Sequence, residues 1–157
     1  MRILIIYDSK FGNTEKIANA IAEVIRPTSE VEVLRVSEAK IDDLEGIGLL
    51  IVGSPTHGGR PTPAVQEFLK KIPNGTLKNA KVAAFDTRIS PDGKNFFMRL
   101  IINIFNFAAP KINRELKIKG VEMAIKPEGF IVEGREGPLK AGELERAAQW
   151  AKGLLSK

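Results

Sequence analysis

Short apolar runs alternate along the chain with longer segments in which apolar residues recur at helical spacing. The runs at residues 3–6 and 49–52 contain no polar position. Such uninterrupted runs are typical of parallel strands that are covered on both faces. Five strands are predicted, at residues 3–6, 31–36, 49–52, 81–85 and 121–125, the last continuing into 130–132 after a break at 127–129.

Helices are predicted after most of these strands, because apolar residues return every three or four positions. The predicted helices are residues 17–25, 63–72, 97–107 and 144–155, with a short helical turn at 41–44. Rounds of strand and then helix specify a parallel sheet with helices on both faces, so the fold class is α/β. Right-handed crossovers leave few topologies, and the strand order 2-1-3-4-5 is a common one.

The composition excludes several kinds of metal site, disulfide and nucleophile. The chain has 157 residues, a length that fits one domain, with no cysteine and a single histidine, His57. Disulfides, thiolate metal sites, iron–sulfur clusters, a cysteine nucleophile and a multi-histidine metal site are therefore excluded. Redox chemistry in this chain would need a bound organic cofactor.

Charge and hydropathy bear on whether the chain binds nucleic acid or spans a membrane. The net charge of +5 comes from 24 basic and 19 acidic residues spread along the chain, without a long basic run, so we expect no nucleic-acid partner. The most apolar stretch, residues 100–109, is interrupted by Asn103 and Asn106, and we expect no transmembrane segment. No signal-peptide pattern precedes the first strand, and a cytoplasmic location is the expectation.

A candidate binding site follows from the topology. In open α/β sheets, ligands bind beyond the carboxyl ends of the strands where the strand order reverses. For the order 2-1-3-4-5 that point lies between strands 1 and 3, which end in the polar segments 9–14 and 54–59. Segment 9–14 leads directly into a helix N-terminus, where free N–H groups and the helix dipole favour a phosphate.

Two alternatives stand beside the phosphate hypothesis. Segment 9–14 could be a plain polar turn in which Asn13 or Thr14 caps the helix. Other phosphate motifs fit less well, because neither G-x-x-x-x-G-K-[ST] nor a G-x-G-x-x-G after the first strand is present.

The segment Ser9-Lys10-Phe11-Gly12-Asn13-Thr14 resembles the phosphate loop of the flavodoxin family, [ST]-x-[TYF]-G-N-T. Segment 54–59 resembles the first flavin loop of that family, and Asp86-Thr87-Arg88 stands where the second begins. The resemblance covers essentially the whole chain. It implies one flavodoxin-like domain over residues 1–157, a three-layer α/β/α sandwich whose five-stranded parallel sheet has the order 2-1-3-4-5, and one FMN as cofactor.

The resemblance also implies which residues bind FMN. The phosphate would be bound by Ser9, Lys10, Phe11, Gly12, Asn13 and Thr14. The isoalloxazine ring would lie between Pro55, Thr56, His57, Gly58 and Gly59 on one loop and Asp86, Thr87 and Arg88 on the other. No catalytic or metal-binding residue is predicted.

The chain departs from the family pattern in its aromatic residues. His57 stands where the first loop often has a tryptophan or tyrosine, and the second loop has no aromatic residue before Phe96 and Phe97. One face of the flavin could therefore be open. His57 could stack on the ring or be a solvated loop residue. Arg88 could neutralise the reduced flavin, bind an acidic substrate or form a surface ion pair.

Three functions remain open. The first is an electron carrier between protein partners, although carrier flavodoxins are usually acidic and this chain is basic. The second is a small FMN-dependent NAD(P)H:quinone oxidoreductase, and the third a binding module without cofactor, which the intact loop disfavours. The redox partner is thus a protein or a small electron acceptor. The apolar segment 96–107 exceeds one helical face and could be a homo-oligomer or partner contact.

Overall fold

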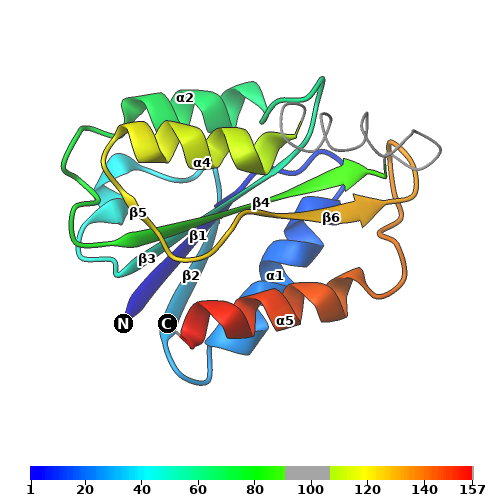
Figure 1. Ribbon diagram of the computed structural model, residues 1–157, viewed down its shortest axis with the longest axis horizontal. Coiled ribbons are helices and arrows are strands. Elements are labelled where there is room, and N and C mark those ends of the chain that lie inside the picture. The colour runs from blue at the N-terminus through cyan, green and yellow to red at the C-terminus, as the bar shows by residue number, and fades with distance from the viewer. Residues whose placement is uncertain (91–106, 157) are drawn as a thin grey trace.

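The computed structural model describes residues 1–90 and 107–156, and Figure 1 shows a sheet that lies between two layers of helices. The strands are β1 (Arg2–Tyr7), β2 (Glu30–Arg35), β3 (Leu49–Pro55), β4 (Lys81–Ile89), β5 (Glu122–Met123) and β6 (Glu128–Val132). The helices are α1 (Asn13–Ile25), the 3₁₀ turn η1 (Ile41–Leu44), α2 (Pro63–Lys71), α4 (Ala108–Ile118) and α5 (Glu143–Leu155).

The sheet has the predicted order, β2-β1-β3-β4-β5, and all of these pairs are parallel. The fifth position is filled by two segments, because β6 also pairs with β4. Strand β5 lies beside Lys81 and Val82, and β6 lies beside residues 85–89. A break was predicted at 127–129, and the structure has it at 124–127, so that β6 already begins at Glu128. The break divides one edge strand into two, and the described part of the sheet has six strands rather than five.

Each face of the sheet is covered by a pair of helices. Figure 1 shows α2 and α4 together on one face and α1 and α5 on the other. Side chains alternate along each strand, so that Leu4 packs under α2 and α4 while Ile5 packs under α1 and α5. Both residues are fully buried, which explains why the runs at 3–6 and 49–52 contain no polar position.

An aromatic cluster joins the edge of the sheet to the C-terminal helix. The rings of Phe85, Phe130 and Trp150 meet edge to face, with centroids 6.1, 6.2 and 6.4 Å apart. Pairs in this geometry stabilise a fold by about 0.5–1.5 kcal/mol beyond the area they bury. The cluster fixes β6 and α5 against β4, which ends at the candidate site.

Most predicted elements are confirmed, and the region after β4 differs. Strand β4 continues to Ile89, beyond its predicted end at residue 85. The predicted helix 97–107 and the contact surface at 96–107 lie outside the described residues, except Phe107, which is extended and precedes α4. Helix α4 itself was not predicted, because Pro110 and the charged residues of its exposed face interrupt the apolar pattern of Ile112 and Leu116.

Pro110 does not prevent the helix because it lies in the first turn of α4, where its missing N–H would have no intrahelical acceptor. None of the helices in the described part of the chain is long and apolar enough to span a bilayer.

Candidate functional site

A pocket opens at the carboxyl ends of β1, β3 and β4, where the sheet order reverses. It is lined by predicted site residues from all three loops, namely Ser9, Lys10, Phe11, Asn13, Thr14, Pro55, Thr56, His57, Thr87 and Arg88. The remaining lining residues are Ile89, Val132 and Arg135. Gly12, Gly58, Gly59 and Asp86 were also predicted as site residues, and they lie around this pocket without lining it.

The first loop begins helix α1 without a side-chain cap. Gly12 is the residue before the helix, and its φ of +90° is a conformation that other residues adopt at a cost. The alternative of a cap by Asn13 or Thr14 is not observed. The Asn13 amide donates to the carbonyl oxygen of Glu136 at 3.1 Å, and the Thr14 hydroxyl lies 2.8 Å from that of Thr87.

Several N–H groups of this loop have no acceptor in residues 1–90 and 107–156. The amide of Gly12 donates to Ser9 Oγ at 3.0 Å, whereas those of Lys10, Phe11, Asn13 and Thr14 have no acceptor among the residues that the structure describes. These free donors lie at the positive end of the α1 dipole. The loop therefore has the chemistry of an anion site.

A second layer of residues holds the loop in place. Asp8 accepts from the amide of Ser9 at 2.9 Å and from the hydroxyl of Thr62 at 2.6 Å. Arg35, at the end of β2, donates to the carbonyl oxygen of Ser9 at 2.8 Å and lies 3.6 Å from Asp8. Sequence reasoning did not identify these supports, because only the folded sheet brings β2 and the start of α2 to this loop.

The second loop is a tight hairpin turn. The backbone of His57 and that of Arg60 exchange two hydrogen bonds, of 2.9 and 3.0 Å. The two residues between them, Gly58 and Gly59, have φ values of +56° and +75°. Positive φ at both central positions is the requirement of a type I′ turn, so both glycines are needed for the turn itself. The turn projects His57 at the pocket.

His57 lies at the mouth of the pocket and is exposed. Its pKa lies below the ordinary value because of partial burial, and the nearby charge of Lys10 lowers it further, against an opposing effect of Asp8. The imidazole is therefore neutral at neutral pH and can lie beside an apolar ring.

Asp86 and Arg88 form a buried ion pair below the third loop. Arg88 donates from Nε and Nη2 to the two carboxylate oxygens of Asp86, each at 2.7 Å, and the carboxylate also accepts from the amide of Ala109 at 2.9 Å. Burial raises the pKa of Asp86, while the hydrogen bonds and charge of Arg88 act in the opposite direction. Asp86 thus joins β4 to the first turn of α4.

The guanidinium of Arg88 lies between two surfaces. Its Cζ atom is 3.7 Å from the centroid of the Phe107 ring. On another side it lies against Gly129 of β6, where a Cβ atom would approach Arg88 Nε to 2.1 Å. The side chain is only 13% exposed, so the surface ion pair considered from the sequence is instead a buried one.

The residues missed by sequence reasoning are brought to the pocket by the edge of the sheet. Ile89 is the last residue of β4 and pairs with Val132 of β6, and Arg135 follows in the next loop. Ile89 and Phe11 are exposed apolar side chains that line the pocket. Ile89 follows three polar residues, 86–88, and nothing local in the sequence indicated either Ile89 or Arg135.

The donor set of the pocket suits an organic anion rather than a metal. Over residues 1–90 and 107–156, no group of three or more His, Asp and Glu side chains could bind a metal ion. The pocket combines amides and hydroxyls with the apolar side chains of Phe11, Ile89 and Val132.

Comparison with known proteins identifies relatives. The family model for the flavodoxin domain matches residues 4–120. The flavodoxin of Aquifex aeolicus is 36% identical over 73 residues, which cover 45% of this chain and 40% of that protein. An NAD(P)H dehydrogenase (quinone) of Methylocella silvestris is 27% identical over 168 residues, which cover 90% of this chain and 78% of that protein. The fold is similar to that of oxidised flavodoxin 2 from Bacillus cereus, with a TM-score of 0.78, 22% identity and 99% of each chain covered.

Proposed function

The chain belongs to the flavodoxin family, and on that premise we propose that it binds one FMN in the described pocket and transfers electrons with it. The family implies FMN as the cofactor. The free amides at the start of α1 carry the proposal for this pocket, because they are clustered donors without a described protein acceptor at the positive end of a helix dipole, where a phosphate can accept from them.

The phosphate fits the first loop. The amides of Lys10, Phe11, Asn13 and Thr14 would donate to its oxygens, as would the hydroxyl of Ser9. Lys10 at the rim would add a positive charge. Among the described residues that line the pocket there is no carboxylate to repel the phosphate.

The isoalloxazine ring fits the other end. Thr56, His57 and Thr87 would flank it, and the exposed side chains of Phe11 and Ile89 would shield it from water. The bound flavin supplies one- and two-electron transfer. The protein would orient the ring, and the guanidinium of Arg88, held in place by its ion pair with Asp86, would form part of the pocket wall beside the ligand.

The test uses two matched glycines. Gly12 precedes α1 with φ and ψ of 90° and −4°, and Gly142 precedes α5 with 91° and −8°; neither helix has a side-chain cap. Gly12→Ala and Gly142→Ala should each cost about 1–2 kcal/mol of stability, because alanine resists this conformation.

Only Gly12→Ala should weaken FMN binding, by about tenfold. That factor corresponds to about 1.4 kcal/mol of binding free energy lost because the loop no longer adopts its conformation at no cost. Quenching of FMN fluorescence on titration measures both affinities. If the unmodified protein neither quenches FMN nor acquires flavin absorbance, the proposal fails and the module without cofactor is favoured.

A second candidate function is supported by one observation. The relative from Methylocella silvestris, an NAD(P)H dehydrogenase (quinone), matches 90% of this chain, whereas the Aquifex flavodoxin matches 45%. The net charge of +5 also departs from the acidic surface of carrier flavodoxins. NADPH oxidation by the FMN-loaded protein in the presence of a quinone would establish the reductase, and its absence with intact FMN binding would favour the carrier.

A further inference from the structure

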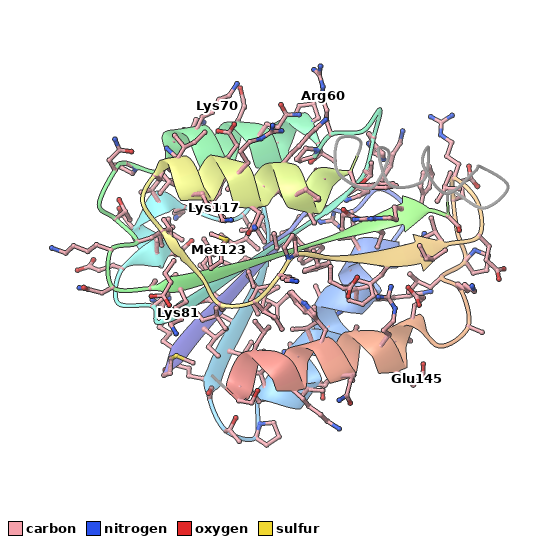
Figure 2. The ribbon with its side chains drawn as sticks, in the orientation of Figure 1. Arg60, Lys70, Lys81, Lys117, Met123 and Glu145 are labelled. Carbon is pink, nitrogen blue, oxygen red and sulfur yellow. The ribbon has the colours of Figure 1, made fainter. Side chains whose placement is uncertain are left out.

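A second cavity lies between α2 and α4, and it shares no lining residue with the proposed FMN pocket. It has a volume of about 290 Å³. Four cationic side chains line it, those of Arg60, Lys70, Lys111 and Arg114, against a single carboxylate, Glu115. Figure 2 shows Arg60 and Lys70 on the α2 side of the molecule. We call this cavity the basic groove.

The described residues do not neutralise the positive charge in the basic groove. Within the described residues, none of the four cations forms an ion pair within 4.0 Å. Burial lowers the pKa of Lys111, and the charges of Arg60 and Arg114 lower it further. These cations therefore repel one another, and a bound anion would relieve the repulsion.

The groove is joined to the turn beside the proposed FMN pocket. Lys111 Nζ donates to the carbonyl oxygen of Gly59 at 2.6 Å. Gly59 belongs to the same type I′ turn as His57, which lines the other pocket. An occupant of the groove would thus lie next to the loop that we assign to the flavin ring.

The shape of the groove favours a small ligand over a protein. Pro61 and Leu69, which are both buried, form an apolar part of its wall, and Gln66 adds an amide. A cavity lined by several cations beside an apolar wall suits a molecule that carries both phosphate and an organic group. An acidic protein would instead contact the exposed cations along α4, Lys117 included.

We propose that the basic groove binds an organic diphosphate, of the kind found in nucleotides and dinucleotides. Arg60, Lys111 and Arg114 would bind its phosphate oxygens, and the wall at Pro61 and Leu69 would contact its organic part. The proposal does not depend on FMN binding, because its residues and its charge are separate from those of the first pocket.

The test compares two cations of the same helix. Arg114 lines the groove, whereas Lys117, also exposed on α4, does not. FMN-saturated protein is titrated calorimetrically with inorganic pyrophosphate, ADP and NADP⁺ at low ionic strength. We expect saturable binding with one site, about tenfold weaker in Arg114→Gln and in Arg60→Gln, as the loss of one charge-assisted contact implies. Binding in Lys117→Gln should remain within about twofold, because screened charges outside the site contribute little.

Comparing the three ligands shows which part of the ligand the basic groove recognises. Equal affinities for pyrophosphate and ADP would assign recognition to the phosphates alone, and tighter binding of NADP⁺ would identify a dinucleotide. The proposal is overturned if no ligand saturates, or if Lys117→Gln weakens binding as much as Arg114→Gln, which would indicate a diffuse surface for an acidic protein.

A further control distinguishes this proposal from the FMN site. If the chain does not bind FMN, the same titration is run on the protein as purified. Weakening by Gly12→Ala rather than by Arg114→Gln would then show that the anion occupies the loop before α1, and the basic groove would be excluded.

Discussion

The hydroxyl oxygens of Thr14 and Thr87 lie 2.8 Å apart, although 73 positions separate these residues in the chain. Both residues are buried, with 1% and 4% exposure. Their hydrogen bond joins the first turn of α1 to the end of β4, and thus connects the two ends of the proposed FMN pocket.

Replacing one hydroxyl should leave the other without a partner. We expect Thr87→Val to lower the free energy of unfolding by about 1–3 kcal/mol, because a buried polar group loses its hydrogen bond. The double variant Thr14→Val/Thr87→Val should recover much of that loss. Urea unfolding measures all three proteins, and Thr28→Val, which removes an exposed hydroxyl, is the control. Additive losses in the double variant would contradict the pairing.

The Asp86–Arg88 pair should be sensitive to the loss of either partner. Asp86→Asn leaves a mostly buried guanidinium without its counter-charge, and we expect a loss of about 3–5 kcal/mol in urea unfolding. The exposed pair Lys81–Glu122 is the comparison, and Glu122→Gln there should change stability by no more than about 1 kcal/mol. Equal effects of the two variants would show that burial does not matter at this pair.

Glu143 should make stability depend on pH in the acid range. Its side chain is 8% exposed, and burial alone would raise its pKa above the ordinary 4.5. Hydrogen bonds from Arg146 and from the amide of Ile131 outweigh burial, so that its pKa in the folded protein is lowered. As pH falls, the unfolded chain is therefore protonated first, and the stabilisation is lost as pH passes through the folded pKa.

The matching variant is Glu143→Gln. At pH 7 it should be less stable than the unmodified chain by about 1–3 kcal/mol, the cost of losing charged hydrogen bonds in a buried site. The difference should shrink below pH 4.5, the ordinary value from which the carboxyl departs. Thermal unfolding across a range of about pH 3–7 measures the difference. This range brackets the ordinary carboxyl pKa of roughly 4. A difference that does not vary with pH would assign the loss to packing instead.

Gly129 should tolerate no side chain. A Cβ atom there would lie 2.1 Å from Arg88 Nε, and the guanidinium is already held by Asp86 and Phe107. We expect Gly129→Ala to destabilise the protein by about 1–3 kcal/mol, as overpacking of a filled site does. At Gly134 the nearest atom to such a Cβ is 3.5 Å away, so Gly134→Ala is the control. If both variants unfold at the same urea concentration, Arg88 does not pack against Gly129 and the prediction is wrong.

The sequence predicted the sheet order and the two principal loops because their signals are local. The run at residues 3–6 is fully buried in β1, and Pro63 begins α2 as expected. The pattern was less informative after β4. There the buried face of α4 depends on two small alanines and on Ile112 and Leu116, between charged positions that face solvent.

Predictions for the site reached the loops but not their supports. Arg35 and Thr62 have no unusual neighbours in sequence, and they act only because β2 ends and α2 begins beside Asp8. Asp86 was expected at the ligand, whereas the structure places its carboxylate against Arg88 and Ala109. Local patterns identify a loop that can bind phosphate, and the contacts between distant segments need the assembled sheet.

The division of the outer edge strand has a consequence for how this fold can grow. Strands β5 and β6 each hold their own register on β4, and no paired strand register spans the four residues between them, 124–127, although the amide of Ala124 still donates to the carbonyl oxygen of Val82 at 2.7 Å. Extra residues placed beside Pro127 would bulge outward while both ladders persisted. This connector is therefore where a longer homologue, or an engineered insertion, could accommodate an additional segment without disturbing the cofactor end of the sheet.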